Sequence, residues 1–92
     1  MNPPANVLYL SASGAVKASP GELLGVILAG GSAASTITIY DNPAAASGAV
    51  LAVLKCAASS GITFTAPAPI RAANGLYASL SGSGATACVV YY

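Results

Sequence analysis

The residues that could perform acid–base or nucleophilic chemistry are few in this chain of 92 residues. There is no histidine, and the five charged residues are Lys17, Glu22, Asp41, Lys55 and Arg71. Without an imidazole, neither a Ser-His-Asp triad nor a Cys-His pair can form, and zinc sites that need histidine are excluded too. We therefore expect a protein that is not an enzyme, with no catalytic residue, metal site, cofactor or small-molecule substrate.

Three local patterns come closest to a site, and each has an ordinary explanation. Lys17 lies two residues before Ser19, but the nucleophilic pattern S-x-x-K is absent from the chain. Nothing in the spacing of Glu22 and Asp41 indicates a pair of catalytic carboxylates. The segment 82–87 matches the dinucleotide-binding pattern G-x-G-x-x-A, which needs a strand before it and a helix after it. Since five residues follow the match, we expect a hairpin turn there.

The charge balance and the apolar stretches exclude two classes of partner. A net charge of +1 provides no basic face, whereas a protein that contacts about 6 to 10 phosphates needs a similar number of Lys or Arg residues. The stretches 23–40 and 72–92 are uncharged, but glycine, serine and other small polar residues interrupt them, unlike the roughly 20 apolar residues of a membrane span. We expect neither nucleic acid nor a membrane as partner. The first residues lack the basic region of a signal peptide, which indicates a cytosol-like compartment.

The two cysteines, Cys56 and Cys88, are too few for a disulfide framework, and their spacing fits no metal-binding motif. A disulfide between them is the alternative to two small buried side chains with free thiols. We favour the free thiols in apolar surroundings.

The fold class follows from turn signals that recur about every 8 to 12 residues, as in an all-β sandwich or barrel. Between them lie short apolar or alternating runs, in which we expect strands at 7–13, 16–18, 22–29, 35–40, 62–65, 76–81 and 87–92. Alanine, glycine, serine and threonine make up 47 of the 92 residues, so the sheets should pack closely over a thin core. The expected fold is one all-β domain over 1–92, a small β-sandwich or jelly-roll-like barrel of about seven to eight short antiparallel strands. Residues 1–6 would form an N-terminal arm.

Three parts of this fold need separate mention. The run Glu22–Ala29 is almost entirely apolar, which is typical of a strand covered on both faces. The segment 43–58 is compatible with a helix, because Asn42 can cap it and it is rich in alanine. It is also compatible with a strand, because Gly48 interrupts the helical run and the residues at 50, 52 and 54 alternate with those at 51, 53 and 55. We favour a turn over 42–47 and a strand over 49–56. Pro67-Ala68-Pro69 should start or protect an edge strand.

The alternation also predicts a core and a set of interface residues. The expected core consists of Val7, Tyr9, Leu24, Val26, Leu28, Ile37, Ile39, Phe64, Leu76, Leu80 and Val89. Tyrosine combines apolar area with one hydroxyl and is favoured at interfaces. Tyr91, Tyr92, Tyr40 and Tyr77 are therefore the candidate interface residues, with the C-terminal pair as the candidate anchor.

Two stretches carry a resemblance to a known family. One runs from Val16 to Leu28 and is followed by Thr36–Asp41; the other runs from Asn74 to Gly82 and on to Val89–Tyr92. In this order they resemble small β-sandwich virion proteins of tailed bacteriophages, over roughly residues 7 to 92. The high alanine and serine content and the two cysteines depart from the family pattern. The resemblance implies a cement or decoration protein that binds the outside of the head shell, with no catalytic residues.

Three functions are weighed on this basis. The first is a capsid cement protein at the virion surface, assembled in the host cytoplasm, a homo-oligomer (trimer or dimer) whose partner is the major capsid protein. The second is a head-tail connector or tail component. The third is a soluble carbohydrate- or peptide-binding β module with an aromatic face of Tyr9, Tyr40 and Tyr77. The composition agrees with the first, since a free monomer relies on surface charge for solubility and only 5% of this chain is charged.

Overall fold

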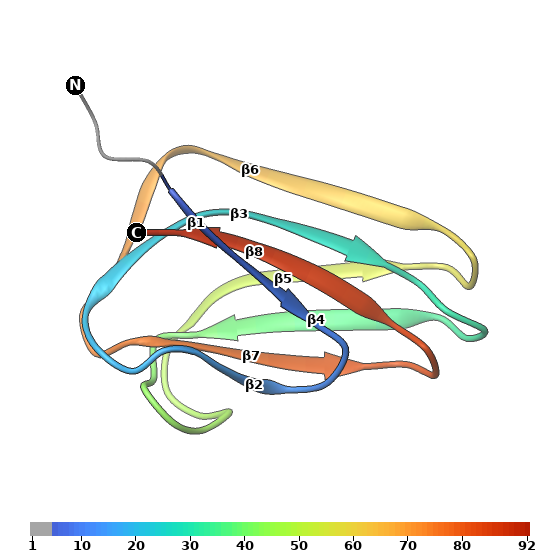
Figure 1. Ribbon diagram of the computed structural model, residues 1–92, viewed down its shortest axis with the longest axis horizontal. Coiled ribbons are helices and arrows are strands. Elements are labelled where there is room, and N and C mark those ends of the chain that lie inside the picture. The colour runs from blue at the N-terminus through green and yellow to red at the C-terminus, as the bar shows by residue number, and fades with distance from the viewer. Residues whose placement is uncertain (1–4) are drawn as a thin grey trace.

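The computed structural model describes residues 5–92, and Figure 1 shows their strands in two layers. The strands are β1 (Asn6–Leu10), β2 (Gly14–Lys17), β3 (Gly21–Ala29), β4 (Ser35–Tyr40), β5 (Val50–Cys56), β6 (Gly61–Ala72), β7 (Leu76–Ser81) and β8 (Thr86–Tyr91). No helix is found within residues 5–92. The all-β prediction is therefore confirmed.

The strands form two antiparallel sheets whose order defines a jelly roll. The first sheet has the order β1-β8-β3-β6 and the second has the order β2-β7-β4-β5. Strand β1 pairs with β8, β2 with β7, β3 with β6 and β4 with β5, so the chain folds back on itself as a ribbon and then rolls up. This is the double-sheet arrangement of eight strands that jelly rolls use to limit exposed edges.

The core lies between the two sheets and is made of small and branched side chains. The fully buried large residues are Leu23, Val26, Leu28, Ile37, Ile39, Leu76 and Val89. Six of them were expected from the alternation, and Leu23 was not. Phe64 and Leu80, also expected, are half-buried and pack against this cluster. The strand periodicity of two therefore identified most of the core.

The prediction for the first strand was wrong in phase. Val7 and Tyr9 were expected in the core, but each is 63% exposed, while Leu8 and Leu10 pack against the core. Leu8 lies opposite buried Val89 on β8, and residues that face each other across a ladder share one side of the sheet. Both sets of side chains are apolar, so the alternation alone does not say which set turns inward.

A β-bulge explains the second error in the core. Leu24 was expected to be buried, but the register of β3 shifts between Leu23 and Gly25 against both of its neighbours. The extra residue reverses the in-and-out alternation, so Leu23 is buried and Leu24 is only half-buried. The prediction that β3 is covered on both faces also fails within one copy of the chain, because Ile27 is half-exposed.

Strand β6 is longer than expected and lies at one edge of the first sheet. It was predicted at 62–65, but it covers Gly61–Ala72, and the pairing with β3 leaves residues 66–69 without partners. Pro67 and Pro69 lie in this unpaired stretch, where their missing N–H groups cost no ladder hydrogen bond. They therefore protect the edge from within the strand and do not start it.

The contested segment is a turn followed by a strand, as favoured. The Asn42 Oδ1 accepts hydrogen bonds from the backbone N–H groups of Ala44 and Ala45, both at 2.9 Å, and its Nδ2 donates to the Ser47 Oγ at 3.1 Å. Strand β5 then begins at Val50. The expected N-terminal arm lies partly outside the described residues, and Asn6 belongs to β1 rather than to an arm.

Candidate interaction surfaces

The outer side of the first sheet forms a surface that we call the apolar face. It consists of Val7, Tyr9, Leu24, Gly25, Ile27, Ala29, Thr63, Thr65, Thr86, Cys88 and Val90. The pairing arranges these residues in rows across the strands, and the central row is Tyr9, Cys88, Ile27 and Thr63. None of these residues is charged, and Glu22 and Arg71 lie beyond them on the same side of the sheet, at one end. The largest exposed side chains of the face are Val7, Tyr9 and Ile27.

A shallow hollow lies in the apolar face, between β3 and β6. It has a volume of about 190 Å³ and is lined by Leu24, Gly25, Val26, Ile27, Thr63, Phe64, Thr65 and Val90. Gly25 contributes no side chain, and a Cβ atom there would lie 2.8 Å from the carbonyl oxygen of Phe64. The close approach of β6 therefore requires glycine, and the missing side chain leaves space on the outer surface.

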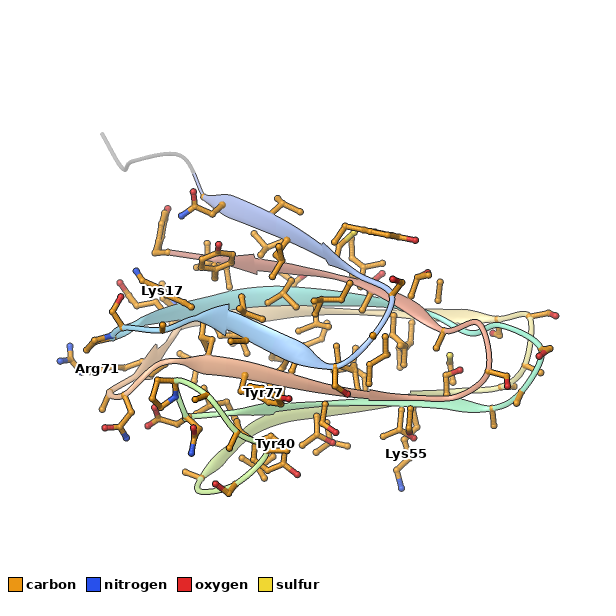
Figure 2. All side chains as sticks on the ribbon, turned by 60° about the horizontal axis from the view of Figure 1, so that its bottom comes forward. Lys17, Tyr40, Lys55, Arg71 and Tyr77 are labelled. Carbon is orange, nitrogen blue, oxygen red and sulfur yellow. The ribbon has the colours of Figure 1, made fainter. Side chains whose placement is uncertain are left out.

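The outer side of the second sheet has a different composition, and we call it the hydroxyl face. It consists of Ala15, Thr36, Thr38, Tyr40, Val50, Val53, Lys55, Tyr77, Ser79 and Ser81. Most of these side chains end in a hydroxyl group, and the exceptions include Val50 and Val53, which are about half-exposed. Lys55 lies on the same side of the molecule as the tyrosines in Figure 2.

The structure brings together two of the predicted interface residues. Tyr40 and Tyr77 are direct partners in the β4–β7 ladder, and Figure 2 shows their rings close to one another on the hydroxyl face. Tyr91, in contrast, lies opposite Leu23 and packs against the core, so it is half-buried. Tyr92 is also half-buried, and its backbone exchanges hydrogen bonds of 2.9 and 3.1 Å with Glu22. These two last residues thus fasten the C-terminus to β3.

The aromatic face expected for a ligand-binding module does not form as a single surface. Tyr9 belongs to the apolar face of the first sheet, whereas Tyr40 and Tyr77 belong to the hydroxyl face of the second sheet. The two faces point away from each other, because the core separates the sheets. The grouping of Tyr9 with the other two tyrosines was therefore wrong.

Three of the five charged residues gather at one end of the molecule. A hollow of about 290 Å³ there is lined by Lys17, Pro20, Gly21, Glu22, Arg71 and Tyr92. Glu22 and Arg71 are partners in the β3–β6 ladder, and Lys17 and Arg71 lie near one another in Figure 2. The two cations and one anion therefore form the most strongly charged surface of the described residues.

Asp41 serves the structure of the second sheet. Its Oδ1 accepts hydrogen bonds from the backbone N–H groups of Asn74 at 2.8 Å and of Gly75 at 3.4 Å. The hydrogen bond from Asn74 is the main cause that holds the pKa of this carboxyl group below its ordinary value. Asp41 and Glu22 lie in different places, so the structure does not bring them together as a carboxylate pair.

Both cysteines are free thiols, as predicted, and both are half-buried. Cys56 packs against the core from the end of β5, with its thiol 3.7 Å from the carbonyl oxygen of Ser60. Cys88 lies in the central row of the apolar face, between Tyr9 and Ile27. Each sheet therefore carries one native thiol.

No protein-family model, curated protein or solved structure matches this chain. Within residues 5–92 no three metal-ligating side chains are grouped, and no helix is long and apolar enough to cross a membrane. The sequence prediction missed the apolar face because it placed Val7 and Tyr9 in the core. The signal that could have found it is the continuous apolar run of β3.

Proposed function

We propose that this chain is a structural virion protein, a capsid cement or decoration protein that binds the outside of a head shell and stabilises it. The observation that carries the proposal is the exposure of large apolar side chains on opposite sides of one small domain. Val7, Tyr9 and Ile27 are exposed on the apolar face, and Val50 and Val53 on the hydroxyl face. A domain with two such faces is suited to a layer in which it contacts more than one neighbour.

The fold supports this proposal by analogy. Eight-stranded jelly rolls occur in viral capsid proteins and also in lectins. Because one fold carries many functions, the surfaces of this chain must distinguish them. The low charge adds support, since only five charged residues serve the whole surface and a shell protein is covered by its neighbours.

The hydroxyl face is the surface that we assign to the shell. Its adjacent rings, Tyr40 and Tyr77, offer apolar area with hydroxyl groups that can bind backbone carbonyls of a neighbouring subunit. In this proposal the partner is the major capsid protein, the protein acts without catalysis or cofactor, and many weak contacts act together.

The first experiment is to count the copies in purified particles that contain the protein, by quantitative mass spectrometry. Hundreds of copies per particle are expected for cement, whereas a dozen or fewer would indicate a head-tail connector or tail component. Binding of the purified protein to a glycan array, with no copies in particles, would instead favour the carbohydrate-binding module.

Particles without the protein should assemble but burst sooner on heating, since a ligand of the mature shell stabilises it by mass action.

The second experiment adds the protein back to stripped particles and measures occupancy. The double variant Tyr40→Ala, Tyr77→Ala should bind at least about 30-fold more weakly, because truncation of an interface hot spot costs roughly 2 kcal/mol or more. The matched variant Tyr91→Ala, Tyr92→Ala tests the C-terminal pair. If only this second variant loses occupancy on the particles, the contact with the shell lies at the C-terminal end of β8 and not on the hydroxyl face. Binding should survive molar salt, where the screening length falls to about 3 Å, because apolar burial dominates.

A further inference from the structure

We infer that the apolar face binds the apolar face of a second copy of this chain, and that a two-fold axis parallel to the strands relates the two copies. This inference does not require the cement function, because it depends only on the first sheet. It gives each chain a partner across the apolar face and leaves the hydroxyl face free.

Strand β3 lacks a cover on one side. Glu22–Ala29 is almost entirely apolar, and such runs are typical of strands that are buried on both faces. In one copy only the inner side is covered, since Leu23, Val26 and Leu28 are fully buried while Ile27 is 46% exposed. A second sheet packed over Ile27 supplies the missing cover.

Charge does not oppose self-pairing in the middle of the face. In an isologous contact, a side chain near the two-fold axis meets its own copy, so a charge there would meet a like charge. The residues of the apolar face include none of the five charged residues. Glu22 and Arg71 lie on the same side of the sheet at its end, where they are ladder partners of opposite sign and form a polar rim.

The apolar face is about as large as a small interface requires. The face spans four strands that lie about 4.8 Å apart, and the strands have 5, 6, 9 and 12 residues that rise about 3.3 Å each. One face therefore measures roughly 500 Å², and two copies cover roughly 1,000 Å² between them. This total is about the smallest that a specific interface needs, and it agrees with a dimer that dissociates on dilution.

The shape of the apolar face selects the axis. Tyr9, 63% exposed, projects from β1 at one edge of the sheet, and the hollow lies between β3 and β6 at the other edge. The proposed two-fold axis is parallel to the strands and lies in the plane between the two packed sheets, over the gap between β8 and β3. This axis places β1 of one copy over β6 of the other. Rotation about this axis keeps positions along the strands, so each Tyr9 meets the row of Ile27 and Thr63 beside the partner's hollow.

The hollow is large enough to receive part of an aromatic ring. Its volume is about 190 Å³, and an apolar cavity of about 150 Å³ in a protein takes up benzene. In an isologous contact the same insertion occurs twice, once from each copy. Sheets that pack face to face lie about 10 Å apart with side chains interdigitated, which is the separation that such an insertion needs.

Sedimentation equilibrium of the purified chain tests the interface. We expect a dimer that dissociates on dilution. Ile27→Lys should weaken dimerisation at least about 30-fold, because it places a lysine in the centre of the face opposite an apolar sheet. The matched control is Val53→Lys, since Val53 is 50% exposed at the centre of the hydroxyl face, and this variant should dimerise like the wild type. A wild-type chain that stays monomeric at every concentration would overturn the inference.

Circular dichroism shows whether Ile27→Lys is folded. If it is not, Tyr9→Ser replaces it, because Tyr9 is on an edge strand and outside the core. The two variants Tyr9→Ser and Val53→Ser then form the comparison. If Val53→Lys abolishes dimerisation and Ile27→Lys does not, the dimer contact lies on the hydroxyl face. If the wild type is a monomer and Ile27→Lys loses its occupancy on the shell, the shell covers the apolar face. Either result contradicts the inference.

The native thiols provide a readout that needs no substitution. Cys88 lies within the proposed interface, whereas Cys56 lies at the end of β5 in the other sheet. Alkylation of the folded protein should therefore become several-fold slower at Cys88 as concentration rises, with no change at Cys56. Equal behaviour of the two thiols across the dilution series would contradict the proposed surface.

A thiol cross-link tests the axis. In a chain with Cys56→Ser and Cys88→Ser, the pair Val7→Cys and Thr65→Cys lies at opposite edges of one sheet, about 14 Å apart across three strand spacings. A cross-linker that bridges about 10 Å should join residue 7 of one copy to residue 65 of the other. The control pair Val7→Cys and Val53→Cys should give no linked dimers. Linkage of residue 7 to residue 7 would exclude this axis.

Discussion

The two outer faces of this molecule have the same backbone plan and different surface chemistry. Each is the outside of a four-stranded antiparallel sheet, and each covers one half of the same core. The apolar face is uncharged and has a hollow at Gly25, while the hydroxyl face has threonine, serine and tyrosine side chains around Lys55. The inner sides determine that the chain folds, and the outer sides determine what it contacts.

The two faces are suited to different kinds of contact. Threonine and valine have similar shapes and both suit a strand, so the choice between them at an exposed position has little effect on folding. A hydroxyl group can bind water or a polar group of a neighbouring subunit, as proposed for the hydroxyl face. An apolar side chain instead gains free energy when another apolar surface covers it, as inferred for the apolar face.

The largest expected effects concern the inner sides, where the two sheets should be equivalent. Leu28→Ala in the first sheet and Ile39→Ala in the second each remove a fully buried side chain and should lower the free energy of unfolding by about 2–5 kcal/mol. Chemical denaturation in dilute solution measures both. Ile27→Ala and Val53→Ala, on the two outer sides, should each cost about 1 kcal/mol or less. A large loss for either outer variant under dilute conditions would break the division between inner and outer roles.

A pair of glycines gives the next largest difference. Gly25→Ala should lower stability by about 1–3 kcal/mol, because the new Cβ lies 2.8 Å from the Phe64 carbonyl oxygen and the backbone must shift. Gly14→Ala in β2 has open space around the new Cβ and should be neutral or stabilising by up to about 1 kcal/mol. Thermal unfolding of both variants measures the difference. Equal losses would show that the approach of β6 to β3 does not depend on glycine.

The sequence predicted the fold class and most of the strands, because turn residues and alternation are local properties. Ile37 and Ile39 alternate with threonine, so their inward direction was clear. At Val7 and Tyr9 the alternating residues are apolar on both sides, and the direction was lost. The bulge at Leu24 depends on how β6 and β8 pair with β3, and no local pattern encodes such a pairing.

The candidate surfaces were harder to predict, since they arise from strands far apart in sequence. Tyr40 and Tyr77 were correct as individual candidates, but only the ladder between β4 and β7 makes them neighbours. Tyr9 was grouped with them because residue type does not reveal the sheet to which a residue belongs. The charged end likewise combines Lys17, Glu22 and Arg71 from three strands.

A smaller effect is expected from the tyrosine pair on the hydroxyl face. A double-mutant cycle of Tyr40→Ala and Tyr77→Ala should give a coupling of about 0.5–1 kcal/mol, since cross-strand aromatic partners stabilise a sheet by this amount. Denaturation of the two single variants and the double variant provides the value. The corresponding cycle of Tyr40 with Tyr9, which lies on the other sheet, should give a coupling near zero. Coupling between the two sheets' tyrosines would contradict the separation of the faces.

The smallest expected effect is a pH dependence at Asp41, which connects the end of β4 to the turn before β7. Hydrogen bonds from the backbone N–H groups of Asn74 and Gly75 favour the ionised carboxylate, so its pKa in the folded chain lies below the ordinary 3.8. In the unfolded chain the group takes up a proton more readily. Stability from this group is therefore fully present above about pH 4 and is lost as the pH falls through the lowered folded pKa.

Wild type and Asp41→Asn should be compared by melting temperature from about pH 6 to about pH 2. The amide keeps an oxygen that accepts the same hydrogen bonds but does not titrate, so the advantage of the wild type should shrink as the pH falls. Because Asp41 is only half-buried, solvent screens the carboxylate and the difference should be small at every pH. A wild-type advantage that grows towards low pH would show that the carboxylate is not stabilised by these hydrogen bonds.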